Sequence, residues 1–134
     1  MPAELPFRIL LVDDEPVIRE LVRTVLTTGA VEVEVASNGA GCLRAARTQP
    51  FDLILLDIVL PDLDGISLCR MLRSDPSTAR IPVYMLTAKA RPADVETAQR
   101  AGADGYINKP FKGADLMDLV EKMQRRRARP QALP

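Results

Sequence analysis

The chain contains no histidine, and only two of its 134 residues are cysteines. The absence of histidine excludes Ser-His and Cys-His catalytic pairs and a His-ligated zinc site. Cys42 and Cys69 lie in helical patterns and lack the Cys-x-x-Cys spacing of metal and redox motifs. We therefore expect both to be small, buried hydrophobic side chains in a reducing compartment.

A charge imbalance and a long apolar run are also missing. Lysine plus arginine equals aspartate plus glutamate at 18 each, so the net charge indicates neither nucleic acid nor a membrane surface as a partner. No apolar run approaches the ~20 residues that span a bilayer. The first six residues do not resemble a secretory signal, since no basic segment precedes a long apolar one. We expect a cytoplasmic protein without membrane insertion.

Strand-like and helix-like patterns alternate along the chain. Short apolar runs indicate strands, and apolar residues spaced three or four apart indicate helices. Five strand–helix units predict an α/β domain with a parallel sheet covered by helices on both faces. The predicted domain is residues 1–127, followed by a disordered tail at 128–134. The predicted strands are residues 7–12, 31–36, 53–57, 81–86 and 105–108, and the predicted helices are 15–28, 38–48, 64–74, 92–102 and 112–127.

Reactive side chains follow four of the predicted strands. Asp13 and Asp14 follow the first strand, Asp57 ends the third, Thr87 follows the fourth and Lys109 follows the fifth. Sites in open α/β sheets form at the carboxyl ends of the strands, so these groups are expected to converge. Three carboxylates, a hydroxyl and an ammonium suit a divalent cation together with a phosphoryl group.

These side chains belong to short motifs that occur in a fixed order. The acidic pair precedes a glutamate, and Asp57 precedes a proline-containing loop. The motifs are Leu11-Val12-Asp13-Asp14-Glu15, Leu56-Asp57 with Pro61 and Asp64-Gly65, Thr87-Ala88, and Gly102-Ala103-Asp104-Gly105-Tyr106 with Lys109-Pro110-Phe111.

With these motifs, the chain resembles the receiver domain of bacterial two-component response regulators, in particular the single-domain, chemotaxis-like kind. The resemblance spans about residues 7–124. It implies a flavodoxin-like (βα)5 fold, doubly wound, with five parallel strands in the order 2-1-3-4-5. It also implies that Asp57 accepts a phosphoryl group from the phosphohistidine of a sensor histidine kinase or a histidine phosphotransfer protein.

The resemblance assigns a role to each site residue. Mg²⁺, with Mn²⁺ as a substitute, is expected on Asp14, Asp57 and the backbone carbonyl of Val59, with Asp13 acting mainly through water. Lys109 is expected to pair with Asp57 before phosphorylation and with a phosphoryl oxygen afterwards. Thr87 and Tyr106 are the expected switch residues, and the bond before Pro110 is expected to be cis.

The resemblance also implies which proteins the chain contacts and how long the phosphoryl group stays on Asp57. A downstream target protein is expected on the fourth helix, fifth strand and fifth helix, and the chain is expected to be a monomer or a weak phosphorylation-dependent dimer. Val59, two residues after Asp57, predicts slow self-dephosphorylation, while the effect of Lys89, two after Thr87, stays open. The arginines at 125–127 and 129 are interpreted as a solvated helix end, with no direct contact to nucleic acid.

Three alternatives remain open. The chain is not expected to be an enzyme beyond its own phosphorylation and dephosphorylation. A Mg²⁺-dependent aspartyl-phosphate phosphatase or phosphotransferase is one alternative, although Glu15 stands where an acid/base aspartate would follow Asp13. The others are a receiver excised from a larger regulator or hybrid kinase, and a scaffold with a vestigial site.

Overall fold

The computed structural model describes residues 6–26, 30–88 and 92–128. Strands and helices alternate throughout, as the sequence predicts. The strands are β1 (Phe7–Val12), β2 (Val31–Ala36), β3 (Leu53–Asp57), β4 (Val83–Thr87) and β5 (Gly105–Asn108). The helices are α1 (Pro16–Leu26), α2 (Gly39–Thr48), α3 (Gly65–Ser74), α4 (Pro92–Arg100) and α5 (Gly113–Ala128).

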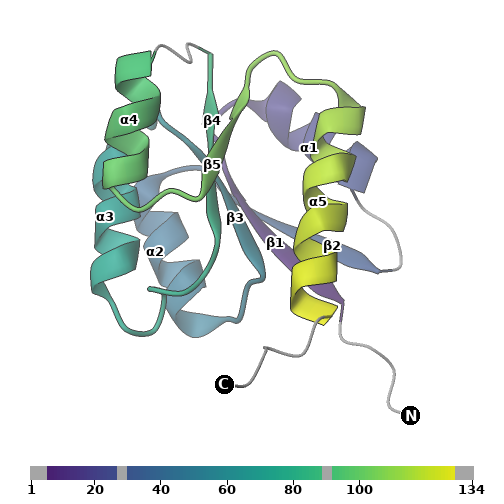
Figure 1. Ribbon diagram of the computed structural model, residues 1–134, viewed down its shortest axis with the longest axis horizontal. Coiled ribbons are helices and arrows are strands. Elements are labelled where there is room, and N and C mark those ends of the chain that lie inside the picture. The colour runs from purple at the N-terminus through teal and green to yellow at the C-terminus, as the bar shows by residue number, and fades with distance from the viewer. Residues whose placement is uncertain (1–5, 27–29, 89–91, 129–134) are drawn as a thin grey trace.

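The five strands form one parallel sheet in the order β2-β1-β3-β4-β5 (Figure 1). Helices α1 and α5 cover one face, and α2, α3 and α4 cover the other. The predicted doubly wound fold and strand order are therefore confirmed. The register places Val12 beside Leu56 and Asp57 beside Leu86, so the carboxyl ends of β1, β3 and β4 lie next to one another.

The sheet divides the apolar core into two clusters. All residues of β3 are buried, because both of its faces are covered by helices. Alternate residues of the central strands pack against opposite helical layers. The α2–α4 side includes Leu10, Ile54, Leu56, Leu68, Leu72 and Met85, and the α1–α5 side includes Ile9, Leu11, Leu55, Val22, Leu116 and Val120. Cys42 and Cys69 are buried in the first cluster as predicted, and burial raises the pKa of the Cys42 thiol to about 12.

Polar side chains set the starts of two helices. Asn38 caps α2 by accepting a hydrogen bond from Gly41 N, and Asp64 caps α3 by accepting one from Ser67 N. The predicted first helix extends to residue 28, but residues 27–29 lie outside the described residues.

Several element ends differ from the predicted ones for local reasons. Strand β4 begins at Val83 rather than residue 81, because Pro82 has no N–H and Ile81 N donates to Thr78 O in a turn. Helix α4 ends at Arg100 rather than residue 102. Gly102 has φ +102° and Ala103 N donates to Ala98 O, which is a Schellman ending. Ala128, the first residue of the predicted tail, still belongs to α5, and residues 129–134 are not described.

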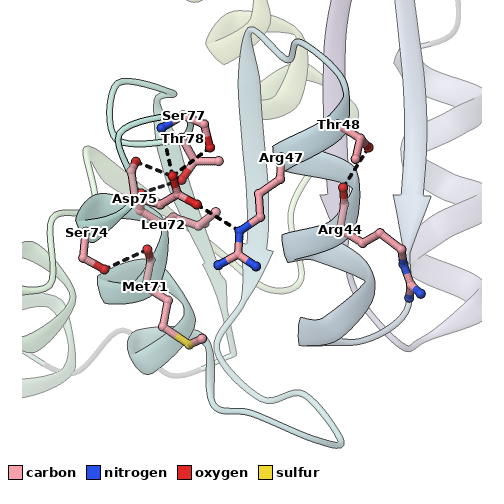
Figure 2. Close-up of polar contacts among 9 residues, drawn as sticks. All are labelled: Arg44, Arg47, Thr48, Met71, Leu72, Ser74, Asp75, Ser77 and Thr78. Atoms are coloured by element: carbon pink, nitrogen blue, oxygen red, sulfur yellow. Dashed lines mark hydrogen bonds and ion pairs between the residues drawn. The ribbon is translucent and has the colours of Figure 1, made fainter.

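An ion pair joins the helices on the α2–α4 side. Figure 2 shows Arg47 of α2 reaching to Asp75 beyond the end of α3, with Nε and Oδ2 2.9 Å apart. Both side chains are partly exposed, so water screens the pair and its contribution to stability is small. Close by in the same figure, the buried hydroxyl of Thr78 donates to Leu72 O at 2.7 Å, which satisfies a polar group inside the fold.

The basic end of α5 is only partly the solvated surface that the sequence predicts. Arg125 and Arg126 are exposed. Arg127 is exposed too, but it also contacts the fold, since its Nη1 donates to Asp52 Oδ2 at 3.0 Å and its guanidinium lies 5.2 Å from the centre of the Phe7 ring. Among the described helices, none is long and apolar enough to cross a membrane.

Candidate functional site

The predicted carboxylates converge at the carboxyl edge of the sheet. Asp13 follows β1, Asp57 ends β3, and one carboxylate oxygen each from Asp13, Asp14 and Asp57 lies within 4.8 Å of the others. Asp13 and Asp57 are buried, whereas Asp14 is exposed. Like charges at this spacing repel, so the cluster is suited to a positive partner.

Lys109 supplies the positive charge that belongs to the chain itself. Its Nζ donates to Asp13 Oδ2 at 2.7 Å, to Asp57 Oδ2 at 3.1 Å and to Glu15 Oε1 at 3.1 Å. The predicted pair with Asp57 is present. The two further carboxylate partners were not predicted, and the shortest contact is to Asp13.

Burial and charge oppose each other at Asp57. Burial disfavours its ionised form and raises the pKa of the carboxyl. The Val59 N–H, which donates to Asp57 Oδ1 at 3.0 Å, and the Lys109 ammonium work in the opposite direction, while the charge of Asp13 adds to the rise. The net pKa lies above the usual aspartate value, so proximity to Lys109 only partly offsets the burial of this carboxylate.

The balance at Lys109 has the opposite outcome. Burial alone lowers the pKa of a lysine, because it disfavours the charged ammonium. The hydrogen bond and charge of Asp13, followed by those of Asp57, together outweigh that effect and raise the pKa of Lys109 above its usual value. Lys109 is therefore a permanent cation beside Asp57 at any physiological pH.

The loop after Asp57 is held at two places. At its base, Gly65 N donates to Ile58 O at 2.6 Å, and a Cβ at Gly65 would lie 2.3 Å from Asp57 O. At its side, the Asp62 carboxylate accepts hydrogen bonds from the N–H groups of Gly39 and Ala40 at the start of α2, at 2.7 and 3.0 Å. These bonds lower the pKa of Asp62. The backbone of Val59 lies within this closed loop.

Of the remaining predicted residues, Thr87 lies at the same edge and Tyr106 lies on β5 beside Met85. Thr87 is buried at the end of β4, and its carbonyl accepts a hydrogen bond from Lys109 N at 2.7 Å. The Tyr106 side chain is 43% exposed, so it is not a core residue. The peptide bond before Pro110 is cis, as predicted. Lys89 lies outside the described residues.

The donor set fits a hard cation. All three clustered groups offer carboxylate oxygens, which suit Mg²⁺ better than a soft metal. Both oxygens of Asp13 already accept hydrogen bonds, Oδ1 from Glu15 N at 2.9 Å and Oδ2 from Lys109. Both oxygens of Asp57 also accept hydrogen bonds, from Val59 N and from Lys109, so the exposed Asp14 carboxylate is the more accessible ligand, and the predicted division of roles stays a prediction.

Two acidic residues near the site were missed from the sequence. Glu15 was named only as the end of a motif and as a departure from a phosphatase pattern, and Asp62, in the loop after Asp57, was given no role. A signal existed for Glu15, since it adjoins the acidic pair. No local pattern points from Asp62 to α2, because the two lie 23 residues apart along the chain.

Comparison with known proteins places this geometry in context. A model of the response regulator receiver domain family matches residues 9–121. The DNA-binding response regulator MtrA of Mycolicibacterium smegmatis is 41% identical over 119 residues, which cover 89% of this chain and 51% of MtrA. The chain thus spans about half the length of the curated relatives that it matches.

Solved structures show the same fold. The chemotaxis response regulator CheY4 of Vibrio cholerae has a TM-score of 0.83 at 28% identity, covering 89% of this chain and 99% of CheY4. The receiver domain of the sensor histidine kinase PA1611 from Pseudomonas aeruginosa has a TM-score of 0.81 at 35% identity, covering 89% of this chain and 98% of that domain. That structure has a magnesium ion coordinated in its active site cleft. The similarities do not favour the phosphatase alternative.

Proposed function

Because the chain belongs to the response regulator receiver domain family, we propose that Asp57 accepts a phosphoryl group from a partner's phosphohistidine. The donor would be a sensor histidine kinase or a histidine phosphotransfer protein. The observation that carries the proposal is the contact between Asp57 Oδ2 and Lys109 Nζ, which lie 3.1 Å apart beside the carboxylates of Asp13 and Asp14.

The chemistry follows from the geometry. An Asp57 oxygen attacks the phosphorus, the phosphorus–nitrogen bond of the donor breaks, and the imidazole leaves with the bonding electron pair. Phosphoryl transfer depends mainly on positioning and charge neutralisation, so the chain needs no separate general base. Lys109 is placed to bind a phosphoryl oxygen as charge develops. Beyond this transfer and the hydrolysis of its own phosphoryl group, no catalytic activity is proposed for the chain.

A divalent cation completes the proposal. Asp14, Asp57 and the Val59 carbonyl would hold Mg²⁺ directly, and Asp13 would act through water; Mn²⁺ offers the same chemistry. When bound, the cation neutralises the clustered carboxylates and the phosphoryl oxygens. The exposed side chain of Asp14 and the restrained Val59 loop support this assignment.

Output would depend on a local switch. The new phosphoryl oxygens give the Thr87 hydroxyl an acceptor, and the exposed Tyr106 can turn inward as Thr87 moves. Thr87 ends β4 and Tyr106 lies on β5, and α4, β5 and α5 form the proposed surface for a downstream partner or a weak dimer. A cytoplasmic location is part of the proposal, because both cysteines are unpaired.

The test replaces the acceptor. Asp57→Asn keeps the shape of the side chain but removes its nucleophilic oxygen, so incorporation of labile phosphate from a phosphorylated kinase or a small phosphodonor should fall to background. Phosphate labelling measured by autoradiography checks this. Asp118→Asn, an exposed substitution on α5, should label like the wild type. Undiminished labelling of Asp57→Asn would reject the assignment.

A further inference from the structure

The hydrogen-bond donors of Lys109 are fully used before any phosphoryl group arrives. An ammonium has three N–H donors and no acceptor. Three carboxylates, those of Asp13, Asp57 and Glu15, lie within 3.1 Å of Nζ. A phosphoryl group on Asp57 would bring further oxygens to an ammonium whose donors are all engaged. For each phosphoryl oxygen that Lys109 binds, one existing contact must be exchanged.

The three partners are not equally replaceable. Asp13 is fully buried, makes the shortest contact at 2.7 Å, and has its other oxygen held by Glu15 N. Asp57 would carry the phosphoryl group, so its own contact to Lys109 would pass to a phosphoryl oxygen on the same residue, and a second phosphoryl oxygen would need one of the other two donors. The Glu15 side chain is 58% exposed, so water can solvate its carboxylate as soon as it leaves Lys109. Glu15 is the partner that can be released at the lowest cost.

We propose that Glu15 is a placeholder for the phosphoryl group, occupying the third donor of Lys109 until a phosphoryl oxygen displaces it. The inference rests on the proposed function and extends it to a positioning residue outside the metal cluster. Glu15 disfavours phosphoryl binding in two ways. It competes for Lys109, and its negative charge repels an incoming anion. Both effects oppose phosphorylation of Asp57.

A simple structural role does not account for this side chain. Glu15 immediately precedes α1, and its carbonyl accepts a hydrogen bond from Arg19 N, which begins the helix. That contribution comes from the backbone and is retained in Glu15→Gln. The side-chain contact is made to Lys109, 94 residues further along the chain.

The experiment measures the affinity of the phosphoryl analogue beryllofluoride in the presence of Mg²⁺ by calorimetry. Glu15→Gln should bind the analogue roughly two- to fivefold more tightly than the wild type, which is the range expected for an exposed ion pair. Glu20→Gln is the matched control, since Glu20 is an exposed acid on α1 and the charge change is the same. It should bind like the wild type. The thermal midpoint of Glu15→Gln without Mg²⁺ and analogue should equal that of the wild type within about 2 °C.

A structure of the wild-type complex supplies the second readout. It should show Lys109 Nζ bound to the analogue, with Glu15 Oε1 beyond hydrogen-bond distance. Three outcomes would overturn this inference and leave the proposed function standing. They are a retained contact between Glu15 and Lys109, equal affinities of wild type and Glu15→Gln, and equal gains in both glutamine variants. If the wild type binds no beryllofluoride at all, the proposed function fails as well.

Discussion

Val59 shows how one side chain can set a lifetime. It stands two residues after Asp57, and its side chain is 75% exposed at the mouth of the site. Its N–H donates to Asp57 Oδ1, but its isopropyl group has no donor or acceptor that could orient a water molecule. The backbone of Val59 therefore serves the site while its side chain offers no help to hydrolysis.

We expect the apolar side chain of Val59 to keep self-dephosphorylation slow. Val59→Asn places an amide where a water molecule would attack, so the phosphoryl half-life should shorten by about three- to tenfold, equivalent to about 1 kcal/mol of barrier. The measurement follows loss of labelled phosphate after the donor is removed. Val59→Ala, which also lacks polar groups, should decay like the wild type. A wild type that decays faster than Val59→Asn would contradict the prediction.

Among the elements, the connection from β3 to α3 has the least room for change. Gly65 begins α3, and an added Cβ would lie 2.3 Å from Asp57 O and 2.7 Å from Ile58 Cα. Both are backbone atoms of the strand end that carries the acceptor. The helix and the site thus share one point of close contact, and only glycine fits there.

Gly65→Ala should disturb stability and site together. Overpacking of this kind costs about 1–3 kcal/mol in the free energy of unfolding, and the displaced loop should also weaken Mg²⁺ binding. Urea unfolding and Mg²⁺ calorimetry measure the two effects. Gly113→Ala is the matched control, because Gly113 begins α5 and its added Cβ would meet Val25 at an ordinary 3.4 Å. Its stability should stay within about 1 kcal/mol of the wild type. Equal stability of both variants would contradict this account of the loop.

For the whole molecule, the clustered carboxylates link stability to the cation. Asp13, Asp14 and Asp57 repel one another in the folded state, and Lys109 compensates only part of that charge. A ligand that binds only the folded chain stabilises it by mass action.

Mg²⁺ at ten times its dissociation constant should therefore add about 1.4 kcal/mol to the free energy of unfolding and raise the thermal midpoint by roughly 4 °C. Differential scanning calorimetry with Mg²⁺ and with a chelator measures the shift. Asp14→Asn should lose most of the response and melt above the wild type in chelator, since it removes one repelling charge. A wild type that does not respond to Mg²⁺ would favour the vestigial scaffold.

Much of this architecture can be predicted from local patterns. The apolar run of β3 and the alternation of elements predict the parallel sheet, and the polar residues after each strand predict where Asp13, Asp57 and Lys109 meet. Less could be predicted where a tertiary contact competes with a local pattern. The apolar pattern predicts that residue 81 belongs to a strand, but Ile81 N donates to Thr78 O in a turn. The run of arginines predicts that Arg127 contacts only solvent, but its guanidinium binds Asp52 and lies over the Phe7 ring.

By itself the sequence determined the order of strands and helices and the kinds of group at the carboxyl edge, because both follow from periodicity and from residues next to strand ends. Only the tertiary structure decided how those groups are paired. Lys109 bonds most closely to Asp13 and also reaches Glu15, and Asp62 holds its loop against α2. The reason is physical: a pairing depends on distances of a few ångströms between residues far apart in the chain, and these distances arise only when the helices pack on the sheet.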